Sequence, residues 1–139
     1  MKFLIASDIH GSATWCRKFI DAIHAEKPDK IILLGDILYH GPRNDLPNGY
    51  GPKEVIALLN PLADRILAVR GNCDAEVDQM VLDFPCMADY STILDPEYID
   101  EDAGYEMQTP RTLFLTHGHV FGPDRDGAIG NLPQMPVNT

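Results

Sequence analysis

Short apolar runs alternate with stretches of helical periodicity along the first half of the chain. Three runs have strand length and no polar alternation: residues 2–6, 30–34 and 65–69. Such runs are typical of strands buried on both faces of a parallel sheet. Between the first two runs, Trp15, Phe19 and Ile23 recur at helical spacing and predict an apolar stripe that packs inward. The pattern predicts strands joined by helical crossovers, which bring the carboxyl ends of the strands to one edge.

The second half of the chain has a weaker pattern. Asp74 is predicted to cap a short helix over residues 75–82. Residues 90–94 and 112–116 are predicted to be strands. The acidic, apolar-poor stretch 95–107 between them predicts either an exposed hairpin loop or a mobile insertion.

A polar side chain follows each buried strand. Asp8 and His10 come after the first strand, Asp36 after the second, Asn72 after the third, and His117 after the strand at 112–116. Asp8 and His10 are spaced i, i+2, so an extended backbone would point both side chains to one face. Carboxylate oxygen and imidazole nitrogen together suit a divalent transition metal. Each residue taken singly is equally typical of a capped turn, and only their convergence predicts a metal site.

A long loop leaves the same edge of the predicted sheet. Residues 37–52 are rich in Gly, Pro and Asn and have no periodicity, which is typical of functional or disordered loops. The loop carries His40 and Arg43. The guanidinium of Arg43 could clamp a phosphoryl oxygen, and a solvated loop arginine is an equal alternative.

Composition narrows the range of partners. The 139 residues fit one domain, and their formal net charge of -10 argues against nucleic acid as the main partner. No segment reaches the roughly 20 apolar residues of a membrane span, so no membrane partner is expected. Cys16, Cys73 and Cys86 have no paired spacing, which predicts reduced thiols and a cytoplasmic location.

Four motifs at strand ends resemble those of the calcineurin-like metallophosphoesterases, and within that family those of the small bacterial phosphodiesterases: Asp8-x-His10, Gly35-Asp36, Gly71-Asn72 and His117-Gly118-His119. The resemblance runs from Met1 to about Gly122. It implies an α/β fold, a metallophosphoesterase-type β-sandwich flanked by helices, in a single domain over residues 1–139.

The resemblance also implies the chemistry. Two divalent ions are expected, most readily Mn²⁺, with Zn²⁺, Fe²⁺ and Ni²⁺ as alternatives. Asp8 and His10 would hold one ion, Asn72 and His117 the other, and Asp36 would bridge them. The implied reaction is hydrolysis of small phosphodiesters by a water that the two metals activate, with no covalent protein intermediate.

Residue roles follow from the same resemblance. The catalytic set is Asp36, Asn72 and His117. Four further residues are expected to contact the substrate: His40, Arg43, Cys73 and His119. Cys73 stands where many relatives have a histidine that protonates the leaving group, so good leaving groups are favoured.

One family motif is absent from this sequence. No Gly-His-x-His follows Gly122, and each ion would therefore lack one imidazole. The domain is expected to be truncated at its C-terminal end, to be a degenerate member, or to take these ligands from another chain, so a homo-oligomer stays open. The alternative function is a non-catalytic interaction protein that keeps the fold.

Overall fold

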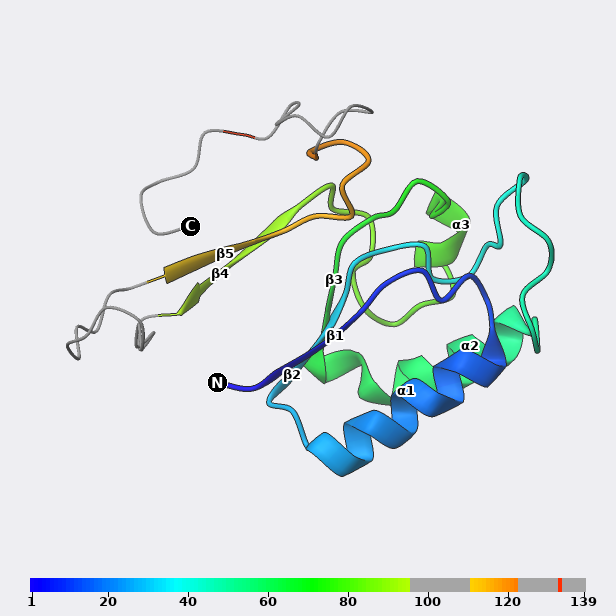
Figure 1. The fold of residues 1–139 in the computed structure, drawn as a ribbon, viewed down its shortest axis with the longest axis horizontal. Coiled ribbons are helices and arrows are strands. Elements are labelled where there is room, and N and C mark those ends of the chain that lie inside the picture. Colours follow the sequence, from blue (N-terminus) through cyan, green and yellow to red (C-terminus); the bar gives the residue numbers. More distant parts are fainter. Residues whose placement is uncertain (96–110, 123–132, 134–139) are drawn as a thin grey trace.

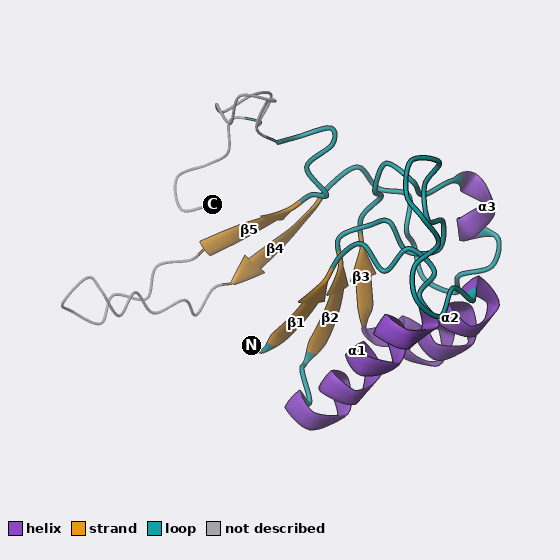
Figure 2. Cartoon of the chain, turned by 45° about the vertical axis from the view of Figure 1, so that its right-hand side comes forward, coloured by secondary structure: helices purple, strands orange, loops and turns teal. Residues whose placement is uncertain are grey.

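The computed structural model describes residues 1–95, 111–122 and 133, and its centre is a three-stranded parallel sheet in the order β1-β2-β3 (Figures 1 and 2). In chain order the elements are β1 (Phe3–Ala6), α1 (Ala13–Glu26), β2 (Lys30–Leu33), α2 (Pro52–Leu59), the 3₁₀ helix η1 (Asn60–Arg65), β3 (Ile66–Ala68), α3 (Glu76–Gln79), β4 (Ser91–Asp95) and β5 (Arg111–Leu115).

The parallel sheet lies between two layers. Helices α1 and α2 cover one face, and the antiparallel pair β4–β5 lies on the other side (Figures 1 and 2). The middle strand shows this alternation: Ile31 and Leu33 belong to the core under the helices, whereas Ile32 packs with Leu115 of β5. After the exposed Lys30, the other three β2 side chains are each at most 1% exposed, which confirms the prediction of a strand buried on both faces.

Helix α1 confirms the helix predicted between the first two strands, but its apolar stripe is shorter. Ser12 caps the helix by accepting a hydrogen bond from the Trp15 N–H. Ile23 is buried and Phe19 packs against the core, whereas Trp15 is 58% exposed. The prediction for Trp15 was therefore wrong. At this first turn the indole lines a surface cavity beside residues 6–9 instead of joining the described core.

The hairpin strands are confirmed within a residue or two. β4 and β5 pair in register from Ser91 opposite Leu115 to Asp95 opposite Arg111. The predicted acidic loop lies outside the described residues, apart from Asp95. Helix α3 is one turn long rather than the predicted span 75–82. None of the helices in the described ranges is long and apolar enough to cross a membrane.

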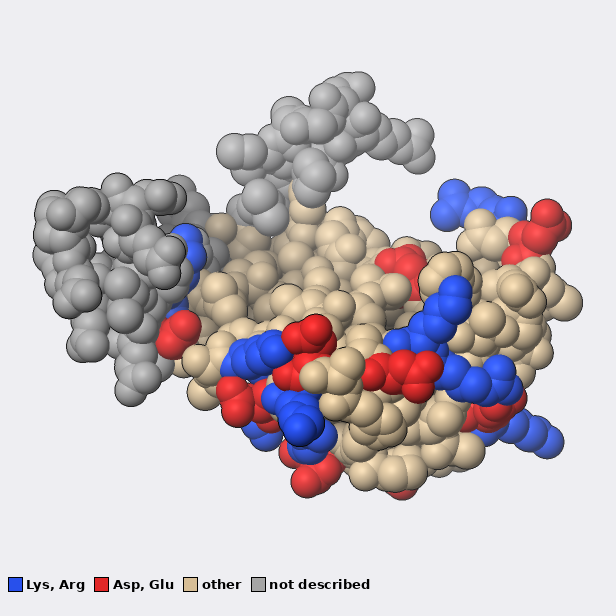
Figure 3. Space-filling view, turned by 60° about the horizontal axis from the view of Figure 1, so that its bottom comes forward, with Lys and Arg blue, Asp and Glu red and all other residues tan. Residues whose placement is uncertain are grey.

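Charges of both signs are interspersed on the face shown in Figure 3, which is the lower, helical side of Figure 1. Arg17 of α1 pairs with Glu54 of α2, and Lys2 pairs with Glu26 at 2.6 Å. These side chains are about half exposed, so each pair adds at most about 1 kcal/mol to stability. Each pair places one basic side chain against one acidic side chain.

Candidate metal centre

The loops after β1 and β2 run side by side beyond the end of the sheet. The Asp8 N–H donates to the Gly35 carbonyl at 3.1 Å, and the His10 N–H donates to the Asp36 carbonyl at 2.8 Å. These bonds continue the pairing of the two strands past their ends. They place the side chains of Asp8, His10 and Asp36 in one small region, as the sequence predicted.

The backbone reaches this arrangement through left-handed conformations. The φ angles are 57° at Asp8, 48° at His10 and 54° at Asp36, a region that costs most non-glycine residues about 1–2 kcal/mol. In the described chain the only other non-glycine residue in this region is Lys27, which ends α1. The extended backbone that the i, i+2 spacing suggested is therefore wrong, although the two side chains do converge.

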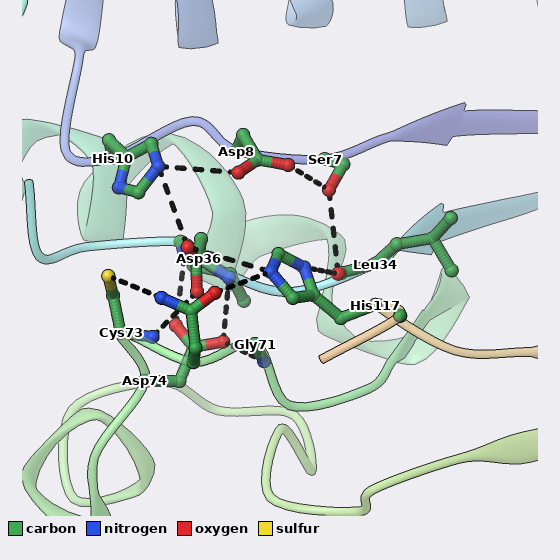
Figure 4. A network of polar contacts seen from close by, with 12 residues as sticks. Ser7, Asp8, His10, Leu34, Asp36, Gly71, Cys73, Asp74 and His117 are labelled. Atoms are coloured by element: carbon green, nitrogen blue, oxygen red, sulfur yellow. Dashed lines mark hydrogen bonds and ion pairs between the residues drawn. The ribbon is translucent and has the colours of Figure 1, made fainter. Parts of the chain in front are cut away.

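Asp36 lies at the centre of the cluster (Figure 4). It is 2% exposed, and its Oδ1 accepts a hydrogen bond from the Cys73 N–H at 2.8 Å. Its Oδ2 faces two imidazoles, 3.5 Å from His10 Nε2 and 3.7 Å from His117 Nε2. A backbone N–H thus holds Oδ1 in place, and Oδ2 is available to bind a cation.

Both imidazoles are oriented by backbone carbonyls. His10 Nδ1 lies 2.7 Å from the Tyr39 carbonyl, and His117 Nδ1 lies 2.6 Å from the Leu34 carbonyl. A carbonyl can only accept, so Nδ1 carries the proton in each neutral ring and Nε2 carries a lone pair.

These Nε2 atoms face more oxygens. His10 Nε2 is 3.3 Å from Asp8 Oδ1, and His117 Nε2 is 3.0 Å from Asn72 Oδ1. A lone pair facing oxygen acceptors is favourable only when a proton or a cation lies between them. Histidine ligands with Nδ1 held by a carbonyl are typical of metal sites.

Two groups of potential ligand atoms share Asp36. One comprises Asp8, Asp36 and His117, and the other comprises His10, Asp36 and Cys73, with the atoms of each group within 4.8 Å of one another. Carboxylates with imidazoles or a thiol fit divalent transition metals. The donor set therefore fits the predicted metals. These groups place Asp8 with His117 and His10 with Cys73, whereas the resemblance implied Asp8 with His10 and Asn72 with His117.

Asp74 has a role that the sequence did not reveal. It is 7% exposed, and its Oδ2 accepts from the N–H groups of Asp36 and Gly71, each at 2.7 Å. Its Oδ1 accepts from the Ile37 N–H at 2.9 Å. The predicted helix cap is wrong, because Asp74 instead ties the loop after β2 to the loop after β3.

Two glycines allow these loops to approach. A Cβ on Gly71 would lie 2.1 Å from Asp36 Oδ1, and one on Gly35 would lie 2.3 Å from the Gly71 nitrogen. No side chain fits at either position. The Gly-Asp and Gly-Asn pairs in the sequence were therefore a signal of close contact between loops as well as of turns.

A cavity of about 580 Å³ opens beside the cluster. Of the four predicted substrate contacts, Arg43 and Cys73 line it. His40 does not, because its ring lies edge-on to Tyr39 and Tyr50, with centroids 4.8 and 5.2 Å away. Tyr39 lines the cavity without having been predicted.

His119 also lies outside this cavity. Its exposed ring stands edge-on to that of His117, with centroids 5.3 Å apart. Partial burial and then the neighbouring His117 lower the pKa of His119. Burial, followed by the Asp36 carboxylate, raises the pKa of the Cys73 thiol to about 11. A thiol with this pKa is protonated at neutral pH.

Comparison with known proteins settles the family. Residues 1–134 match the sequence profile of the calcineurin-like phosphoesterases. The chain belongs to this family. It is 43% identical over 138 residues to phosphodiesterase YfcE of Escherichia coli K12, and equally so to that of E. coli O157:H7. The alignment covers 99% of this chain and 65% of each relative.

A solved structure of this family has the same fold. The E. coli phosphoesterase YfcE superposes with a TM-score of 0.79 at 41% identity, covering 97% of this chain and 64% of that one. The predicted resemblance and the α/β metallophosphoesterase fold are confirmed. This calcineurin-like chain spans just under two thirds of the length of the relatives it matches.

Proposed function

We propose that this chain acts as a divalent-metal-dependent phosphodiesterase on small phosphodiesters. One observation carries the proposal: a buried carboxylate oxygen of Asp36 faces the Nε2 atoms of both His10 and His117. Backbone carbonyls fix both rings so that their lone pairs point inward. The arrangement supports a pair of cations that share one carboxylate. Membership of the phosphoesterase family supports hydrolysis as the reaction.

The ligand assignment gives each ion its own residues. Asp8 and His10, whose facing atoms are 3.3 Å apart, would hold one ion. Asn72 and His117, whose facing atoms are 3.0 Å apart, would hold the other, and both ions would share Asp36. Mn²⁺ suits this mixture of oxygen and imidazole nitrogen. Two such ions, when bound, lower the pKa of a water and stabilise an in-line displacement at phosphorus. The carbonyl bonds at Nδ1 keep both imidazoles aligned for this purpose.

The remaining side chains of the cavity act on the substrate. The Arg43 guanidinium binds a non-bridging oxygen of the phosphoryl group and holds it beside Asp36. The Cys73 thiol lines the same cavity and would face the leaving group. A thiol is a weaker proton donor near neutral pH than an imidazolium, so esters with good leaving groups react fastest. The net charge of -10 supports a small substrate rather than nucleic acid. The proposed location is the cytoplasm.

Hydrolysis of bis(p-nitrophenyl) phosphate tests the proposal. The full chain is assayed with added Mn²⁺ and with EDTA. The Asp36→Asn variant, in which the side chain keeps its shape but loses its charge, is assayed with added Mn²⁺. We expect Mn²⁺-dependent release of p-nitrophenolate that EDTA and Asp36→Asn abolish. The monoester p-nitrophenyl phosphate serves as the control and should react more slowly. A folded, Mn²⁺-loaded chain without turnover would support the interaction protein instead.

A further inference from the structure

A second cavity shares Asp8 with the first. Its volume is about 420 Å³. Its walls are the last residue of β1, residues 7–9 of the loop that follows, and Trp15, Lys18 and Phe19 of α1. Because Asp8 lines both cavities, this second space borders the candidate metal centre. A group attached to a phosphorus at Asp36 could extend past Asp8 into it.

The wall formed by α1 combines an aromatic surface with a cation. Trp15 is 58% exposed, and the Lys18 ammonium lies 4.0 Å from the centroid of the indole. Phe19 adds a half-buried ring. Among the residues that the structure describes, the Lys18 ammonium pairs with no carboxylate. It is therefore available to an anion in a chain of net charge -10.

We propose, on the basis of the proposed function, that this cavity binds an aromatic ester group of the substrate, so that the preferred substrates are aryl or nucleoside phosphodiesters. The ring would pack against Trp15 and Phe19, since planar rings gain from stacking whatever their substituents. Lys18 would offset the repulsion between the anionic diester and the carboxylate of Asp8. Neither an aliphatic ester arm nor water makes comparable use of an exposed indole with an ammonium held over its ring.

Trp15 allows a direct binding measurement, because it is the only tryptophan in the chain. The full chain is titrated with diphenyl phosphate or dimethyl phosphate while its tryptophan emission is excited at wavelengths that phenyl esters do not absorb. We expect a saturable change with diphenyl phosphate at a concentration about tenfold lower than with dimethyl phosphate, as loss of one stacking contact would produce. A flat titration, or equal affinity for both esters, would overturn the inference.

A charge-matched pair tests the role of the ammonium in the same titration. Lys18→Ala should weaken diphenyl phosphate binding several-fold. Lys53→Ala, an exposed lysine on α2, should leave it unchanged. If both variants bind diphenyl phosphate equally well, Lys18 acts only through its contribution to the net charge. The proposed role of its ammonium in this cavity would then be refuted.

Kinetics with a matched substrate pair separates this inference from the proposed function. Methyl p-nitrophenyl phosphate and phenyl p-nitrophenyl phosphate release the same leaving group. Trp15→Ala should lower the phenyl-to-methyl ratio of kcat/KM about tenfold. Trp15→Phe should keep most of the ratio, and Met80→Ala, a variant of a side chain 82% exposed after α3, should keep all of it.

The outcomes are distinct. Saturable binding of diphenyl phosphate without hydrolysis of either chromogenic ester would refute the phosphodiesterase and leave an aryl-phosphate site. Hydrolysis of both esters, with a ratio that Trp15→Ala does not change, would leave the phosphodiesterase and overturn the aromatic subsite.

Discussion

Replacing Asp74 by Asn should destabilise the whole domain although Asp74 touches no ligand. The carboxylate accepts three buried N–H groups, two at Oδ2 and one at Oδ1. The best orientation of an Asn keeps its oxygen at the Oδ2 position and turns its NH₂ toward the Ile37 N–H. That leaves one buried donor unsatisfied, at a cost of about 1–3 kcal/mol. The other two bonds lose their charge assistance, which roughly halves their strength.

We expect these contributions to lower the free energy of unfolding by about 3 kcal/mol. This is a large part of the roughly 5–15 kcal/mol that stabilises a typical domain. Urea unfolding of the full chain measures it. With an m-value of about 2 kcal/mol/M, the midpoint should fall by about 1.5 M while m stays unchanged. Mn²⁺ affinity should fall as well, because Asp74 holds the backbone of Asp36 in place.

Asp78→Asn is the matched control for this measurement. Asp78 is equally buried, at 7% exposed, but accepts the Ala75 N–H alone, at 2.8 Å. An Asn can keep that single bond, so the change should be smaller than about 1 kcal/mol. If Asp74→Asn shifts the midpoint no more than Asp78→Asn does, Asp74 does not hold the two loops together.

Three further predictions address the centre and its surroundings. Asp36→Asn should lower the affinity for Mn²⁺ more than tenfold and abolish turnover in a folded chain; metal analysis with circular dichroism checks this, and retained turnover would refute the shared role. Arg43→Ala should raise KM or lower kcat/KM without changing metal content, whereas loss of metal would show a structural role for the loop. Burial, opposed by the Ala75 N–H and aided by the Asp74 charge, raises the pKa of Asp78 above its ordinary 3.8. The native state then holds this proton more tightly than the unfolded state. The stability of the wild type relative to Asp78→Asn should therefore fall as pH rises from below 3.8 to neutrality. A difference between the urea midpoints of the two proteins that stays the same at every pH would contradict this.

The sequence alone determined the arrangement of strands and the identity of the clustered residues. An uninterrupted apolar run of this length indicates a strand, so β1, β2 and β3 were visible without any homologous structure. The expected burial of β1 was wrong, because its Ile5 is 52% exposed. The parallel crossovers then required the residues after each strand to meet at one edge. Asp8, His10 and Asp36 were therefore predictable as neighbours. Their resemblance to a family motif supplied the expected roles, which the geometry by itself does not assign.

Only the tertiary structure decided how these residues are held. The bonds from Asp74 to Asp36 and Ile37 join positions 38 and 37 residues apart, and a local pattern carries no record of such partners. An Asp before a helix has the same sequence signal whether it caps that helix or holds a distant loop.

Exposure was likewise decided in three dimensions. Trp15 continues the spacing of a buried stripe, but burial depends on whether another element covers that turn of the helix. His40 sits on the predicted loop, yet its ring packs between two tyrosines instead of facing the cavity. Periodicity fixes the direction in which a side chain points along its own element. What it meets there depends on the packing of elements that are distant in the chain.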